Sequence, residues 1–241
     1  MTDLVSSALD AGVLTLTLGN GVAHPLSLPM IRALHGALDV PEARVIVIHG
    51  PGRIFCAGHD LKEIARHRAD PDRGAAYLTA LFDACAALML AVAQCPVPVI
   101  AQFEGIATAA GLQLVAACDL AYAADTATVC LPGVRNGGFC TTPAVAVSRA
   151  IGRKAVNELL LTGEDRGADW ALRVGLVNEV VPRDALGARV TAVAQGLAQR
   201  NAAPIRDGRA CLSAHLALPL EAAYALATPV MVRHFLDENR R

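Results

Sequence analysis

The chain has 241 residues, of which 54% are hydrophobic and 18% charged, and its formal net charge is −1. This length and composition suit a globular protein with one α/β core and exclude a disordered chain. The charge offers no basic face for nucleic acid, no uninterrupted apolar run reaches the ~18 residues of a membrane span, and the N-terminus lacks the basic start of a secretory signal. We therefore expect a cytoplasmic protein that binds neither nucleic acid nor a membrane.

Strands and helices alternate through much of the chain, and helices dominate its last part. Hydrophobic runs rich in β-branched residues predict strands at 13–18, 44–49, 99–103, 120–123 and 177–181. Helical spacing predicts a helix capped by Ser27, a short helix from Leu61, a long helix from after Pro71 to about 93, and helices at 109–117, 144–150, 153–161, 168–174, 185–200, 204–215 and 220–236.

This order predicts an α/β core over residues 1–200 and a helical module over residues 201–241. The most apolar region, 80–101, is interrupted by Asp83, Gln94, Pro96 and Pro98. We interpret it as a buried helix followed by a strand.

The seven cysteines predict reduced thiols. Their number is odd, no Cys-x-x-Cys pair occurs, and most lie among apolar residues. That usage is typical of buried thiols in a cytoplasmic protein. No group of histidine, cysteine and carboxylate residues has the spacing of zinc ligands, so we predict no metal.

A first motif, residues 53–63, joins a predicted strand to a predicted helix. Gly58 permits a tight backbone path and Asp60 can cap the helix. A loop that enters a helix presents free backbone N–H groups. By itself, the motif is equally typical of an ordinary strand-to-helix turn.

A second motif, residues 104–114, also follows a buried strand and starts a helix of small residues. Small side chains let a ligand approach the backbone where the helix dipole is positive. Small residues serve close helix packing equally well, so this motif alone does not decide between a ligand-binding site and close packing.

Together the two motifs resemble those of the crotonase, or enoyl-CoA hydratase/isomerase, superfamily. The resemblance covers nearly the whole chain, from His24-Pro25-Leu26-Ser27 through residues 161–164 to residues 168–182. Residues 57–61, 109–116 and 139–143 are most similar to a subfamily of hydratase-domain-containing proteins, one of them mitochondrial in animals.

The resemblance implies a crotonase (ClpP-like) ββα spiroid core with a C-terminal helical module that is shorter here than usual. It implies a homotrimer or hexamer, and an acyl-CoA or enoyl-CoA thioester as substrate, with CoA part of the substrate and no separate cofactor. It also implies an oxyanion hole made by the backbone N–H groups of His59 and Ala110. The CoA contacts it implies come from His24, Pro25, Leu26, Ala57, Asp60, Leu61 and Lys62.

Two glutamates of the hydratases are missing from the pattern. By register their positions hold Gln113 and Gly133. An amide does not titrate and glycine has no side chain, whereas general acid–base groups typically contribute ~10²–10⁴-fold in rate. The sequence therefore predicts a protein that polarises a thioester yet hydrates enoyl-CoA poorly.

Other side chains are candidates for the missing chemistry. His59 can act as a base or only shape the pocket, and Cys140 can be a nucleophile or a small lining residue. Gln113 can orient a water or form a structural hydrogen bond. We expect structural roles for three acids: Glu104 in a turn, Glu63 on an exposed helix face and Asp119 in a hydrogen bond.

Three functions remain open at this point: an acyl-CoA enzyme working through a thioester enolate, an acyl-CoA thioester hydrolase, and a non-catalytic acyl-CoA-binding protein. Apolar residues suggest an acyl pocket or, equally, core packing: Ile106, Leu131, Val134 and Phe139.

Overall fold

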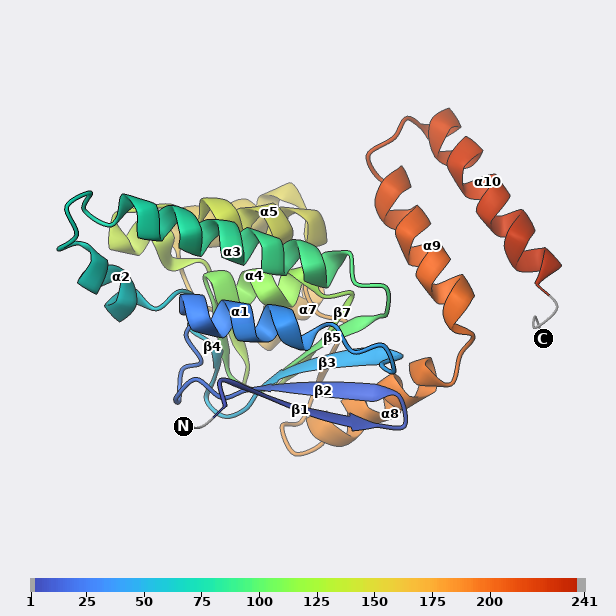
Figure 1. Ribbon diagram of the computed structural model, residues 1–241, viewed down its shortest axis with the longest axis horizontal. Helices are drawn as coiled ribbons and strands as arrows, with labels where there is room; N and C mark the ends of the chain where they lie inside the picture. Colours follow the sequence, from blue (N-terminus) through green and yellow to red (C-terminus); the bar gives the residue numbers. More distant parts are fainter. Residues whose placement is uncertain (1–2, 238–241) are drawn as a thin grey trace.

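The computed structural model describes residues 3–237, which form two sheets surrounded by helices (Figure 1). The larger sheet has the order β1-β2-β3-β5-β7-β10, and only β1 and β2 run antiparallel. Its strands are β1 (Val5–Asp10), β2 (Val13–Leu18), β3 (Val45–Gly50), β5 (Val99–Phe103), β7 (Leu120–Ala124) and β10 (Glu179–Val181). The smaller sheet has the order β4-β6-β8-β9, with β4 (Ile54–Cys56), β6 (Ile106–Thr108), β8 (Thr128–Cys130) and β9 (Arg166–Gly167).

Three consecutive turns of chain supply three strands to each sheet. Each turn adds one strand to the large sheet, then one to the small sheet, and continues into a helix: β3-β4-α2, β5-β6-α4 and β7-β8-η1. The helices are α1 (Leu28–Ala37), α2 (Leu61–His67), α3 (Ala75–Ala93), α4 (Ala110–Ala117), η1 (Pro132–Asn136), α5 (Thr141–Ala150), α6 (Arg153–Thr162), α7 (Ala168–Arg173), α8 (Leu186–Ala198), α9 (Ala202–His215) and α10 (Leu220–Leu236). The stacked turns place the three parallel strands of the small sheet, β4, β6 and β8, directly before a helix at the same edge of the fold, whereas β9 runs antiparallel to β8.

Two predicted caps are confirmed. Ser27 Oγ accepts a hydrogen bond from the backbone N–H of Met30, with Pro29 in the first turn of α1. Asp60 Oδ1 accepts from the N–H groups of Lys62 and Glu63 and so caps α2.

The predicted strands and helices are present with small shifts at their ends. The predicted strand 44–49 is observed as β3, and the predicted strand 177–181 is shortened to β10. Neither β1 nor any strand of the smaller sheet was predicted from the sequence. Three of the small-sheet strands have three residues and the fourth has two, too few to show an alternating pattern.

The prediction of a buried helix before β5 is half right. In α3, Leu81, Cys85 and Leu88 are buried, but the opposite side is exposed, including Leu90 at 56%. Of the helices in the described part of the chain, α3 alone is long and apolar enough to cross a membrane by length and composition, a test that core helices also pass. Its contacts with α1 and α4 place it on the core.

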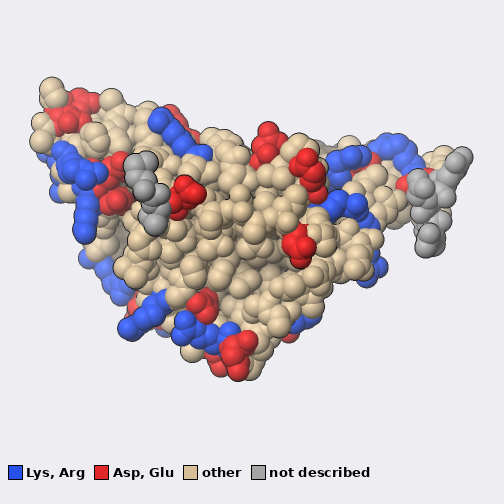
Figure 2. All heavy atoms as spheres, turned by 60° about the horizontal axis from the view of Figure 1, so that its bottom comes forward, with Lys and Arg blue, Asp and Glu red and all other residues tan. Residues whose placement is uncertain are grey.

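Charged side chains of both signs lie on the face formed by β1, β2 and α8. Figure 2 shows them mostly toward the margins, around a broad uncharged area. This face has no continuous basic patch of the kind that nucleic acid requires. The absence of a nucleic-acid partner nevertheless stays a prediction.

The helices α9 and α10 extend away from the body as an antiparallel pair (Figure 1). Asn201, where the module was predicted to begin, caps α9. The domain boundary stays a prediction, and residues 1–2 and 238–241 of the two predicted segments lie outside the described residues.

One arginine holds α9 to the body. Arg209 donates to both carboxylate oxygens of Asp119 at 2.6 Å and to the carbonyls of Cys95 and Val97. Asp119 also accepts from the Val99 N–H at 2.8 Å, so it has the structural role that the sequence analysis expected.

We expect Arg209→Ala to lower the free energy of unfolding by about 2–3 kcal/mol, because hydrogen bonds to charged groups contribute ~1.5–3 kcal/mol. Urea unfolding measures this. The control is Arg206→Ala on the same helix, since Arg206 is exposed and its one ion pair among the described residues is with its sequence neighbour Asp207. Equal stability of the two variants would show that Arg209 does not anchor α9.

Candidate active site

The first predicted loop leaves β4 and enters α2. Gly58 has a φ of +82°, which favours glycine. The loop is held by Leu26, whose N–H donates to the Gly58 carbonyl at 2.7 Å and whose carbonyl accepts from the Asp60 N–H at 3.4 Å. This pairing turns the N–H of the residue between them, His59, away from Leu26.

The second loop leaves β6 and enters α4. Ala109 is the residue before the helix and has φ 51° and ψ −120°. Its N–H donates to the Cys130 carbonyl at 3.0 Å, and its carbonyl accepts from the Gln113 N–H at 3.1 Å. The next residue, Ala110, is fully buried and begins the helix.

The two loops meet at Gly58. A Cβ placed on Gly58 would lie 3.1 Å from the Ala110 nitrogen and 2.9 Å from the Ala109 methyl carbon. Within residues 3–237, neither the His59 N–H nor the Ala110 N–H has a hydrogen-bond partner. The structure thus brings together two free N–H donors from loops 51 residues apart in sequence, an arrangement that can hold a carbonyl oxygen carrying negative charge.

The His59 imidazole lies beside this pair. It meets the Phe82 ring edge-on with centroids 5.0 Å apart, and its Nε2 is buried without a partner among the described residues. Burial lowers the pKa of His59 to about 4. The side chain is therefore a neutral base at pH 7. Phe82 was not predicted as a site residue, because its only signal in the sequence is an aromatic side chain outside the buried stripe of its helix.

Gln113 lies on the first turn of α4 and is 4% exposed. Its Oε1 has no hydrogen-bond partner in the described part of the chain. The structural hydrogen bond considered for Gln113 is therefore not formed by this oxygen. A buried amide oxygen without a partner typically costs 1–3 kcal/mol. The oxygen is available to a water or ligand donor.

Gly133 lies in η1 and is covered by the loop that follows. A Cβ at this position would lie 2.7 Å from the Cys140 nitrogen and 2.9 Å from the Phe139 carbonyl carbon. The backbone of residues 139–140 therefore fills the space that a side chain at 133 would need. Burial raises the pKa of the Cys140 thiol, with the Gly133 N–H opposing part of the shift, so this thiol is protonated at neutral pH.

Comparison with known proteins decides the family. The family model "Enoyl-CoA hydratase/isomerase" matches residues 11–241. The chain belongs to this family. A crystal structure of a family member from Silicibacter pomeroyi is 62% identical with a TM-score of 0.93, covering 98% of this chain and 100% of that one.

Two further relatives carry the same subfamily name. The mitochondrial enoyl-CoA hydratase domain-containing protein 3 of Rattus norvegicus is 38% identical over 234 residues, 95% of this chain and 76% of its own. The crystal structure of the human protein is 35% identical with a TM-score of 0.91, covering 98% of this chain and 94% of that one. The α/β crotonase fold and the subfamily resemblance are confirmed.

Several predicted CoA contacts of this crotonase-family protein surround the first loop. Ala57 and Asp60 are half-buried on it, and Leu61 and Lys62 follow exposed on α2. Pro25 precedes Leu26 and is half-buried.

His24 and Leu26 have structural roles as well. His24 is 4% exposed with its Nε2 3.1 Å from the Pro51 carbonyl oxygen, and the Leu26 side chain is fully buried. Both hydrogen-bonding groups of the Leu26 backbone are used to hold residues 58–60. Leu26 therefore supports the loop that carries His59, and its contact with CoA stays a prediction.

One expectation about acids was wrong. Glu63 does not lie on an exposed helix face: it is half-buried, and its Oε2 accepts from the Leu28 N–H at 3.1 Å at the start of α1. Glu104 lies in a turn, as expected, where it accepts from the Gly52 N–H at 2.6 Å and pairs with Arg183 at 2.9 Å.

The four residues suggested for an acyl pocket fall into two groups by burial. Leu131 is fully buried and belongs to the core, whereas Ile106 and Phe139 are 39% and 48% exposed, and Val134 is half-buried. Only the last three have side-chain surface available to an acyl group.

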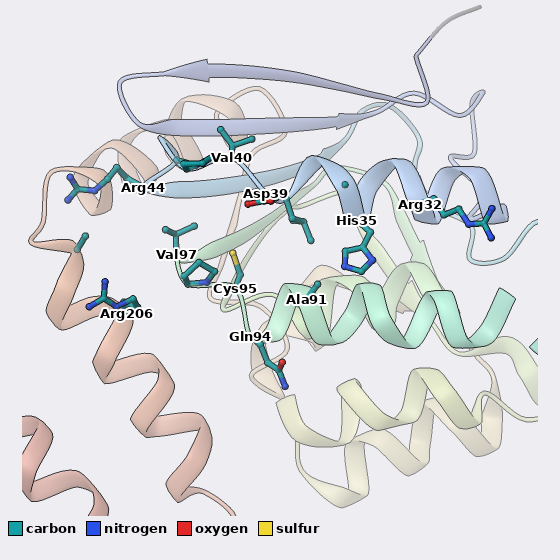
Figure 3. Close-up of a pocket in the computed structure, with 16 residues that line it drawn as sticks. Arg32, His35, Asp39, Val40, Arg44, Ala91, Gln94, Cys95, Val97 and Arg206 are labelled. Carbon is teal, nitrogen blue, oxygen red and sulfur yellow. The ribbon is translucent and has the colours of Figure 1, made fainter. Parts of the chain in front are cut away.

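A hollow of about 900 Å³ opens away from this site, between α1, the end of α3 and the start of α9 (Figure 3). Arg32, Ala91 and Arg206 line it from the three helices. Because His59 packs on Phe82, in the first half of α3, the hollow lies at the other end of that helix and is not the predicted thioester site.

The stability contribution of His59 depends on pH. Its pKa falls from 6.5 to about 4 on folding, so between these values the unfolded chain binds a proton that the folded protein does not. This contribution is complete above pH 6.5 and is lost as the pH falls toward 4. We expect wild type to lose more stability than His59→Gln between pH 7 and pH 5 in urea unfolding; parallel losses would contradict the assignment.

Proposed function

We propose that this crotonase-family protein is an acyl-CoA-processing enzyme that stabilises a thioester enolate with the backbone N–H groups of His59 and Ala110. The observation that carries the proposal is the meeting of two unpaired N–H donors at Gly58. Each preorganised donor of this kind is typically worth about 3–4 kcal/mol in the transition state. An acyl-CoA-binding protein without catalysis has no need of such a pair.

The candidate groups at positions 113, 133 and 140 supply no acid that titrates near neutral pH. Gln113 is an amide, Gly133 has no side chain, and the Cys140 thiol is protonated. Neutral His59 is a base on the loop that supplies one donor, and we assign it the transfer of a proton at the acyl α-carbon. Adding water to an enoyl thioester requires an acid and a base together, so hydration is expected to be slow.

Two assays test the proposal. Calorimetry is expected to show tighter binding of butyryl-CoA than of CoA, and deuterium exchange at the butyryl α-carbon is expected to fall at least tenfold in His59→Ala. Equal binding of butyryl-CoA and CoA, or exchange at the uncatalysed rate, would contradict the proposed stabilisation of an enolate. Crotonyl-CoA hydration is expected to stay near the uncatalysed rate.

A third assay, run beside these two, separates the alternatives. Release of free CoA from a panel of acyl-CoA thioesters would indicate a hydrolase. Binding with neither exchange nor release would indicate a non-catalytic acyl-CoA-binding protein.

We further propose that the protein assembles as a homotrimer or hexamer through its last two helices. Large apolar side chains on α10 and at the end of α9 are exposed, with Leu216, directly after α9, at 74%, Leu220 at 73% and Tyr224 at 68%. Exposed apolar surface of this kind favours association, because contact with another copy of the chain removes it from water. Analytical ultracentrifugation tests this, and a monomer at micromolar concentration would contradict it. The cytoplasmic location stays a prediction.

A further inference from the structure

We infer that Ala109 is a positioning residue for the oxyanion hole, in that its unusual backbone conformation aims the Ala110 N–H and its methyl group spaces the two donor loops. The inference rests on the proposed function, since it concerns the same pair of donors.

The backbone of Ala109 lies where residues other than glycine are rare. Its φ of 51° and ψ of −120° match the first central position of a type II′ turn, which glycine dominates. Strained conformations persist where the surroundings determine them, and they gather at functional sites. Here both backbone groups of Ala109 are bonded, the N–H to Cys130 and the carbonyl to the Gln113 N–H.

This conformation decides where the Ala110 N–H points. The Ala109 carbonyl is directed along α4, because it accepts from the Gln113 N–H. The described residues contain no cis peptide, and in a trans peptide the N–H lies opposite the carbonyl. The Ala110 N–H therefore points out of the start of the helix, where its nitrogen lies beside Gly58 and the N–H has no partner within the described residues.

The methyl group of Ala109 has its own contact. It is the atom nearest to the place where a Cβ on Gly58 would lie, at 2.9 Å. Glycine at 58 and alanine at 109 thus complement each other, and the methyl group sets how closely the His59 loop approaches the start of α4. A glycine at 109 would relieve the backbone strain but remove this spacer and let both donors move.

The test compares two alanines that both have a positive φ. Ala109→Gly removes the proposed spacer, and Ala11→Gly is the matched control, because Ala11 has a φ of 47° in the exposed turn between β1 and β2. The probes are acetoacetyl-CoA, whose enolate has its own ultraviolet absorbance, and CoA, which has no thioester carbonyl. Binding is measured by calorimetry and folding by thermal unfolding.

We expect both glycine variants to fold with a midpoint equal to or above that of wild type. Only Ala109→Gly is expected to bind acetoacetyl-CoA about tenfold more weakly with a reduced enolate band, while its affinity for CoA is unchanged. Ala109→Ser, which keeps a Cβ, is expected to retain the band. An Ala109→Gly protein that behaves like Ala11→Gly overturns this inference alone. A wild-type protein that binds acetoacetyl-CoA no better than CoA overturns the proposed function and the inference with it.

Discussion

Replacing Gly111 with alanine is expected to lower the free energy of unfolding by about 3 kcal/mol, the upper end of what overpacked cores usually lose. The added Cβ would lie 2.2 Å from the Cys56 carbonyl oxygen and 2.8 Å from its carbonyl carbon. Both are backbone atoms of a fully buried residue, so no rotamer change relieves the collision. The helix α4 must therefore move away from β4.

Urea unfolding of Gly111→Ala measures the loss, and Gly196→Ala is its control. Gly196 is exposed within α8, and a Cβ there meets no atom within 4 Å, so alanine is expected to stabilise by ~0.5–1 kcal/mol. Since β4 leads into Gly58 and α4 carries Ala110, the same movement is expected to weaken acyl-CoA binding. A Gly111→Ala protein as stable as wild type would show that α4 and β4 are not in this contact.

Placing a glutamate at position 133 is expected to destabilise the protein by about 2–3 kcal/mol and to produce no hydration, because a side chain forced into a packed backbone typically costs 1–3 kcal/mol. The Cβ of Gly133→Glu would lie 2.7 Å from the Cys140 nitrogen. The loop must open to admit it, and the carboxylate is then carried with the displaced loop. Gln113→Glu is closer to isosteric and changes only the chemistry of one buried group.

The measurements are crotonyl-CoA hydration and urea unfolding of Gln113→Glu, Gly133→Glu and the double variant. Gly138→Ala is the control within the same loop, because the nearest atom to its added Cβ is 3.8 Å away. It is expected to retain wild-type stability within about 0.5 kcal/mol. A gain of a hundredfold or more in hydration by the double variant would show that only the acids were missing and that the loop accepts them.

The elements that could be read from the sequence are those with strong local signals. The strands 13–18 and 99–103 were found because their hydrophobic runs extend over five or six residues, and the starts of α1 and α2 because Ser27 and Asp60 bond to N–H groups within three residues. The two-motif pattern also led to the family, since its glycines and small residues are needed wherever two backbones approach closely.

The smaller sheet had no such signal. Its strands are too short to be periodic, and they pair only because successive turns of chain stack on one another. The role of Glu63 was misjudged for a related reason: its partner, the Leu28 N–H, lies 35 residues away in sequence.

The sequence by itself determined the family, the length and order of the main elements, and the identity of the two residues whose N–H groups were expected to form the hole. Only the tertiary structure decided that those N–H groups are unpaired and adjacent, and that Ala109 is held in a conformation that suits glycine. It alone showed that the space beside Gly133 is filled by the Cys140 backbone. The reason is physical: residue types and local spacing set backbone preference and hydrogen bonding within a few residues, whereas the approach of Gly58 to Ala110 depends on how whole turns of chain pack.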